Sequence, residues 1–124
     1  RVGVAIASLV ARLPRALTVL LADDSLVERL RTIVAEEQVA VLVVGVPRNL
    51  SGQETSQSAK IRAKGTELGR ELGFEPIFVD ESFSSKRADE VLAESKNVQK
   101  DMQDALAASF ILDEFFVTMK EEEM

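Results

Sequence analysis

Apolar and polar residues follow two different periods along this chain, and each period predicts a type of element. Residues 2–7 alternate Val and Ile with Gly and Ala, which is typical of a strand, and residues 16–22 form a second apolar run. Residues 25–38 change to a helical period, with apolar side chains on one face. Residues 39–46 are continuously apolar and rich in Val, which indicates a strand covered on both faces.

The second half of the chain also alternates helices and strands. A long helix is expected to end at Leu72, because Gly73 is the residue type that most often adopts the left-handed conformation after a helix. A short apolar run over residues 76–79 predicts another strand, and residues 100–119 predict the last helix. Between them a shorter helix is expected, with an inner face of Ala88, Val91 and Leu92.

Two of the helices are expected to begin with a capping box, in which a Ser and a Glu three residues later satisfy free backbone N–H groups. The boxes are Ser25 with Glu28 and Ser51 with Glu54. The resulting order, β-β-α-β-α-β-α-α, combines an antiparallel start with strand–helix crossovers. It predicts an α/β fold, a mixed sheet flanked by helices on both faces.

Composition narrows the chemistry that is available. The 124 residues include no His and no Cys, which excludes Ser-His-Asp triads, His-bound zinc, disulfides and thiolate chemistry. Any catalysis must then use carboxylates, Lys, hydroxyl groups or a metal held by oxygen. No apolar run approaches the roughly 20 residues of a membrane-spanning helix, so no membrane association is expected.

The net charge of −6 is not typical of a strongly basic nucleic-acid-binding protein. Part of the negative excess is expected to lie in an acidic tail, residues 120–124, after a single domain over residues 1–119. With this net charge the basic residues can still form a local basic surface, or they can be scattered and solvated. The basic residues that gather in the middle of the chain are Arg48, Lys60, Arg62, Lys64, Lys86 and Arg87.

Three acids lie where the expected fold brings strand ends and a helix together. Asp80 and Glu81 directly follow the strand over residues 76–79, and ligand sites of open α/β sheets form beyond the carboxyl ends of strands. Asp104 heads an otherwise apolar stripe of the last helix, so it is expected to be buried, close to Glu81.

Two converging carboxylates repel each other and both stay ionised only beside a cation. Mg²⁺, or Mn²⁺ in its place, is the natural candidate because it takes oxygen ligands. Each acid also has a simpler explanation. Asp104 could be a first-turn acid favoured by the helix dipole, and Glu81 an ordinary polar residue before a helix. Together, the two acids favour a metal site.

The loop that follows residues 39–46 suits an anion. Arg48 and Asn49 offer donors, Gly52 allows close backbone approach, and the next helix presents free N–H groups. This pattern predicts a phosphate-binding loop. A capped strand–helix connection without a ligand is the alternative, and no Walker motif occurs.

Four segments of the chain resemble motifs of the YqgF family of RNase H-like nucleases. RVGVAIAS resembles the family's RIGVA strand, and VLVVGVPRNLSGQE resembles its VGLP-x-N-x-x-G loop. VDESFSS is similar to D-E-R-x-[ST]-[ST], and DALAASFIL to D-x-x-A-A-x-x-I-L. The resemblance covers nearly the whole chain in the family's order, and it implies a ribonuclease H-like fold.

The resemblance also implies a Mg²⁺-dependent phosphodiesterase site built from three acids. Glu81 and Asp104 match two of these catalytic metal ligands, and Asp80 matches a supporting aspartate. The third is the aspartate of a D-x-G motif that precedes the RIGVA strand. Because the sequence opens at Arg1, this acid and the first strand of the family's sheet are expected to be missing from it.

The function that the resemblance implies is a cytoplasmic nuclease, monomeric or homodimeric, which matures the 5′ end of pre-16S rRNA. Resolution of four-way DNA junctions is the alternative activity, and it would require paired active sites. Ser82 stands where the family usually has Arg, so a phosphate contact is either lost or taken over by Arg87. The sequence is also compatible with a non-catalytic nucleic-acid-binding protein, and with an actin-like nucleotide-binding domain, which would need a second lobe.

Overall fold

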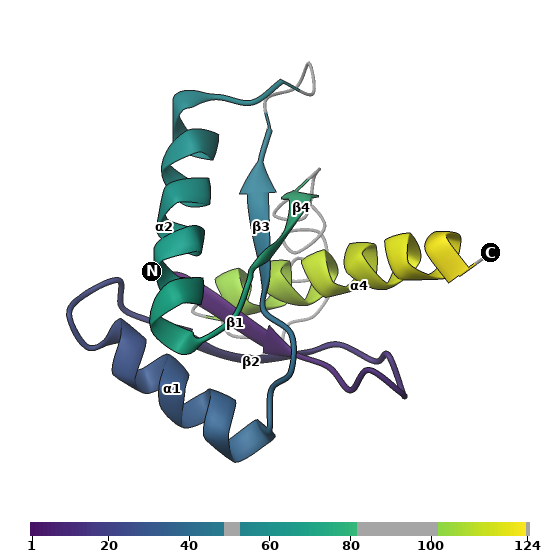
Figure 1. The fold of residues 1–124 in the computed structure, drawn as a ribbon, viewed down its shortest axis with the longest axis horizontal. Coiled ribbons are helices and arrows are strands. Elements are labelled where there is room, and N and C mark those ends of the chain that lie inside the picture. The colour runs from purple at the N-terminus through teal and green to yellow at the C-terminus, as the bar shows by residue number, and fades with distance from the viewer. Residues whose placement is uncertain (49–52, 82–101, 124) are drawn as a thin grey trace. The chain divides into compact units, whose positions relative to one another are not determined.

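The computed structural model describes residues 1–48, 53–81 and 102–123 (Figure 1). The elements confirm the predicted α/β fold class, with both directions of strand pairing. Among the described residues the strands form two two-stranded sheets: residues 2–6 pair antiparallel with residues 15–20, and residues 43–47 pair parallel with residues 77–81. The short helix expected around residues 88–92 lies outside the described residues. In chain order the elements are β1 (Val2–Ile6), β2 (Arg15–Leu20), α1 (Leu26–Glu37), β3 (Val43–Pro47), α2 (Ser56–Leu72), β4 (Ile77–Glu81) and α4 (Gln103–Glu123).

The chain divides into two compact units. The first unit joins Arg1–Leu20 to Phe83–Met124 and contains β1, β2 and α4. The second unit is Leu21–Ser82 and contains α1, β3, α2 and β4. In the part of the chain that the structure describes, no helix has the length and apolar character needed to cross a membrane.

The first unit packs α4 against the β1–β2 pair. Gly3 of β1 lies against the backbone of Asp104 and Ala105, and a Cβ at this position would overlap the Asp104 carbonyl group. Only glycine therefore lets β1 approach the first turn of α4 this closely. Among the described residues of this unit, the buried apolar side chains are Leu20, Ala105, Ala107, Ile111, Phe115 and Phe116.

The second unit packs α2 against the parallel β3–β4 pair. Val46 of β3 is fully buried. Two buried glycines of α2 provide the space for the strands: a Cβ at Gly65 would press on the ring of Phe78, and one at Gly69 on Pro76. Small residues on α2 thus allow a large side chain on β4 to fill the interface.

The start of α1 differs from the predicted capping box. Ser25 precedes the helix, but its side chain makes no capping hydrogen bond, and Glu28 pairs with Arg31. Asp23 supplies the turn instead, because its Oδ1 accepts from Ser25 Oγ (2.5 Å) and from the Ser25 backbone N–H (2.9 Å). These two hydrogen bonds lower the pKa of Asp23 from its ordinary value of 3.8, and the bond from the Ser25 hydroxyl has the larger effect.

The start of α2 also differs from the prediction. The expected box of Ser51 with Glu54 is wrong, since the helix begins four residues later, after Thr55. The Thr55 side chain accepts from the Ser58 backbone N–H, and Ser58 Oγ accepts from the Thr55 backbone N–H. This reciprocal pair satisfies two backbone donors that the first turn leaves without helical partners.

Element lengths follow the predictions in part. Gly73 ends α2 with φ of +86°, which confirms the expected left-handed cap. The strand expected over residues 39–46 is shorter, and Val46 is the one buried residue within β3. The last helix is longer than expected, because α4 continues to Glu123 and takes up most of the acidic segment.

Gly3→Ala should lower the free energy of unfolding by about 1–3 kcal/mol, because the atoms that a Cβ would overlap belong to the α4 backbone and cannot rotate away. Thermal unfolding followed by circular dichroism measures this loss. Hydrogen exchange in the first turn of α4 should accelerate as well. Gly73→Ala is the control for the exchange measurement alone: its Cβ meets nothing within 4 Å, and the strain of Ala at φ +86° falls on the end of α2 in the second unit, so exchange in α4 should be unchanged. Unchanged stability and exchange in Gly3→Ala would contradict the close packing.

Asp23→Ala should weaken the fold at neutral pH and lose this effect in acid. The pKa of Asp23 is lowered by folding, so its contribution is present above its ordinary pKa and disappears as the pH falls through the lowered one. Urea unfolding at pH near 6 and again below pH 3 tests this. Asp24→Ala, which removes the same charge one residue later, is the matched control. A difference between wild type and Asp23→Ala that is equal at both pH values would refute the assignment.

Candidate functional site

The carboxyl ends of β3 and β4 meet at one edge of the second unit. The parallel register pairs Val46 with Asp80 and Pro47 with Glu81, so both strands end at the same level. Arg48 directly follows β3 there. The sequence places Asp80 at the end of one strand and Arg48 after another as separate features, and the parallel register brings the two together.

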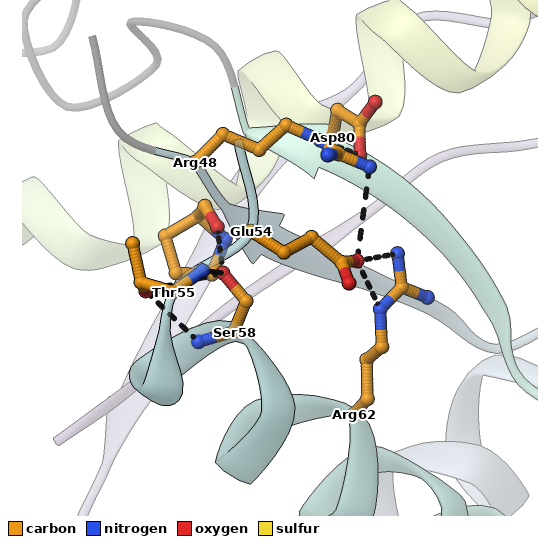
Figure 2. Close-up of polar contacts among 7 residues, drawn as sticks. Arg48, Glu54, Thr55, Ser58, Arg62 and Asp80 are labelled. Carbon is orange, nitrogen blue, oxygen red and sulfur yellow. Dashed lines mark hydrogen bonds and ion pairs between the residues drawn. The ribbon is translucent and has the colours of Figure 1, made fainter. Parts of the chain in front are cut away.

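Arg48 is held between two carboxylates. Its Nε lies 2.7 Å from Asp80 Oδ1, and one of its terminal nitrogens lies 3.7 Å from Glu54 Oε1. Figure 2 shows Asp80 and Glu54 on either side of the guanidinium. The Arg48 side chain is 27% exposed, so it is neither solvated on all sides nor closed off. Asp80 therefore positions Arg48 at the strand ends.

Glu54 binds a second arginine at the same oxygen. Arg62 Nε donates to Glu54 Oε1 at 2.6 Å, and a terminal nitrogen of Arg62 also contacts this atom. The Arg62 guanidinium carbon lies 5.2 Å from the centre of the Phe78 ring, a cation–π distance. The side chains Asp80, Arg48, Glu54 and Arg62 thus form one continuous row of alternating charges (Figure 2).

Ser58 ties the start of α2 to the end of β3. Its side chain is fully buried, and its Oγ donates to the Pro47 carbonyl. The same oxygen accepts from the Thr55 backbone N–H. The first turn of α2, which carries Ser58, is thereby fixed beside the strand end that carries Arg48, and Arg62 follows one helical turn later.

Asp104 lies in the first turn of α4, in the first unit. Its Oδ2 is 3.3 Å from Arg1 Nε, and its side chain is 41% exposed. The expected burial of Asp104 is therefore wrong. Ile111 and Phe115 of the apolar stripe below it are buried as predicted, and Ala108 is half-buried. The Asp104 carboxylate in the first turn is partly exposed instead, and Arg1 neutralises it.

The remaining predicted site residues are described only in part. Asn49, Gly52 and Arg87 lie outside the described residues. Glu81 is described by its backbone, as the last residue of β4, in the second unit. The joint metal site of Glu81 and Asp104 stays a prediction. Within residues 1–48, 53–81 and 102–123 there is no group of three or more acids placed to hold a metal ion.

Sequence reasoning missed Glu54, Arg62 and Arg1 as partners of the expected site residues. Arg62 was visible in the basic cluster and Glu54 in the loop. No helical spacing links Glu54 with Arg62, because the two are eight residues apart and Glu54 lies before the start of α2. Arg1 and Asp104 are at opposite ends of the chain, so only packing of β1 on α4 brings them together.

Known proteins match this chain over most of its length. A relative from Dehalococcoides mccartyi is 34% identical, with 92% of this chain and 88% of the relative aligned. A relative from Thermosynechococcus vestitus is 32% identical over 93% and 80% of the two chains, and one from Burkholderia vietnamiensis 32% over 99% and 86%. All three carry the name "Putative pre-16S rRNA nuclease".

The family described as "RuvX: Holliday junction resolvase" matches residues 1–118, nearly the whole chain. This match and the relatives confirm the resemblance to RNase H-like nucleases that the four sequence motifs indicated. The chain therefore belongs to the RuvX family of Holliday junction resolvases.

Proposed function

We propose that this protein is a nuclease that hydrolyses phosphodiester bonds in structured nucleic acid. The observation that carries the proposal is the family match over residues 1–118. The absence of His and Cys from the sequence agrees with a site that uses carboxylates. Residues 1–119 would act as one nuclease domain, in the cytoplasm, as a monomer or homodimer.

The leading substrate is pre-16S rRNA, cut at its 5′ end. The support is that the three relatives are named as pre-16S rRNA nucleases and align over at least 92% of this chain and 80% of their own length. The second candidate is the four-way DNA junction named in the family's description. A cleavage assay with both substrates separates them. Cutting of a pre-16S rRNA fragment and no cutting of a junction would support the first, and the reverse result the second.

Glu81 and Asp104 are the proposed catalytic residues and the proposed ligands of Mg²⁺ or Mn²⁺. Their carboxylates are the donor type that these hard cations prefer, and the Asp104 side chain is 41% exposed, which allows access. When bound, the cation would lower the pKa of water and stabilise the leaving oxygen. Arg1 pairs with Asp104, so Arg1 has to release this carboxylate before it can bind a metal.

Arg48, Asn49, Gly52 and Arg87 are the proposed substrate-binding residues. The role is best supported for Arg48, which lies at the strand ends and whose Nε is 2.7 Å from Asp80 Oδ1. A planar guanidinium suits phosphate oxygens. Asp80 is therefore proposed as a supporting residue that orients Arg48 and does not itself bind metal.

Asp104→Asn should reduce nuclease activity by at least about a hundredfold, since it removes a charged metal ligand. The fold should survive, because the exposed pair with Arg1 contributes about 0–1 kcal/mol. Cleavage of a labelled RNA with Mg²⁺ measures the activity, and thermal unfolding checks the fold. Asp113→Asn, the same change further along α4, is the matched control. Full activity in Asp104→Asn, or equal losses in both variants, would contradict the assignment.

Mn²⁺ should bind at Asp104 and broaden the NMR signals of the first turn of α4 and of residues around Glu81. Arg1→Gln should tighten this binding, because it removes the cation that competes for the Asp104 carboxylate. Asp104→Asn should abolish the broadening near residue 104. Broadening confined to the acidic residues 121–123 would rule out the proposed metal site.

A further inference from the structure

Two arginines of the second unit converge on a single oxygen atom. Glu54 Oε1 lies 2.6 Å from Arg62 Nε and 3.7 Å from a terminal nitrogen of Arg48 (Figure 2). Arg48 comes from the end of β3 and Arg62 from the second turn of α2. Two cations from different elements thereby define a position that is suited to an oxyanion.

Each arginine is also held from β4. Asp80 pairs with Arg48 at 2.7 Å, and the Phe78 ring lies under the Arg62 guanidinium at 5.2 Å. Phe78 and Asp80 are two residues apart, so they lie on the same face of the strand. The two guanidiniums are thus supported independently of Glu54, and they would remain close together if Glu54 turned away.

The three central side chains are reachable from solvent. Arg48, Arg62 and Glu54 are 27%, 37% and 43% exposed. Glu54 precedes the first residue of α2, so no helical backbone constrains it. Exposed ion pairs are held weakly, and an incoming anion with more charge and more oxygens competes well with a carboxylate.

We propose that Arg48 and Arg62 form a binding site for a phosphate group, and that the Glu54 carboxylate occupies this site until phosphate displaces it. The identification of the ligand as a backbone phosphate of the substrate rests on the proposed nuclease function. The site itself rests on the convergence of two supported guanidiniums on one oxygen. Glu54 is then an internal competitor that lowers affinity, and Arg62 is a second substrate-binding residue beside Arg48.

The test measures binding of a labelled 20-nucleotide single-stranded RNA by fluorescence anisotropy, with a chelator present to prevent cleavage. Glu54→Gln should bind about two- to fivefold more tightly than wild type at low salt, because it frees two arginines from exposed pairs. Arg62→Gln and Arg48→Gln should each weaken binding, and each should reduce the slope of log K against log[salt] by about 0.7. Arg62→Gln should also cancel the gain of Glu54→Gln in the double variant.

Glu71→Gln is the matched control. Glu71 also lies on the second unit and pairs with an arginine, Arg31, at 3.6 Å, and the change alters net charge by the same amount. An equal gain in affinity for Glu71→Gln and Glu54→Gln would show a general charge effect and overturn the proposal. Unchanged affinity in Glu54→Gln or in Arg62→Gln would overturn it as well.

Inorganic phosphate distinguishes a free ion from a nucleic-acid phosphate. In an NMR titration of the Glu54→Gln variant, the side-chain Nε–H signals of Arg48 and Arg62 should shift and that of Arg31 should not. Shifts with inorganic phosphate but no effect of these variants on RNA affinity would overturn the assignment to nucleic acid. Cleavage is tested separately. If the wild-type protein binds RNA as described but does not cleave it, the proposed nuclease function is wrong and the proposed phosphate site is still supported.

Discussion

Backbone pairing of Val46 with Asp80 in the parallel β3–β4 ladder determines where the charged groups of the second unit can lie. A shift of this register by one residue would turn Asp80 to the opposite face of the strand and separate it from Arg48. The hydrogen bond from Ser58 to the Pro47 carbonyl then fixes α2 at the same level. Packing of the Phe78 ring against Gly65 holds the helix close enough for Arg62 to reach over β4.

The apolar pattern of the sequence predicted most strands and helices because burial of one face sets the period of an element. Helix starts could not be predicted so well, since several Ser, Thr and Asp side chains near each start can cap equally well by local criteria. At α2 the choice depends on Ser58, whose hydroxyl also bonds the Pro47 carbonyl eleven residues away. That contact exists only in the folded chain, so the sequence favoured Ser51 instead.

The same distinction separates the two halves of the candidate site. The sequence indicated that Arg48 and Asp80 each follow a strand, but that they meet depends on the parallel pairing of β3 with β4 in the structure. The ion-pair partners of the acids could not be predicted from the sequence. Arg1 reaches Asp104 only through the contact of Gly3 with α4. Glu54 meets Arg48 and Arg62 only where α2 begins beside the end of β3. Ion pairs between residues far apart in the sequence produce no periodic pattern from which they could be predicted.

The row of alternating charges from Asp80 to Arg62 contains two acids and two bases, so its local charge sums to zero. Together with a net charge of −6 for the whole chain, this leaves little long-range attraction for a polyanion. Encounter with nucleic acid should therefore be slow and only weakly steered, in contrast to proteins with a basic face. Discrimination between strands would then lie in how long a complex persists once short-range contacts form.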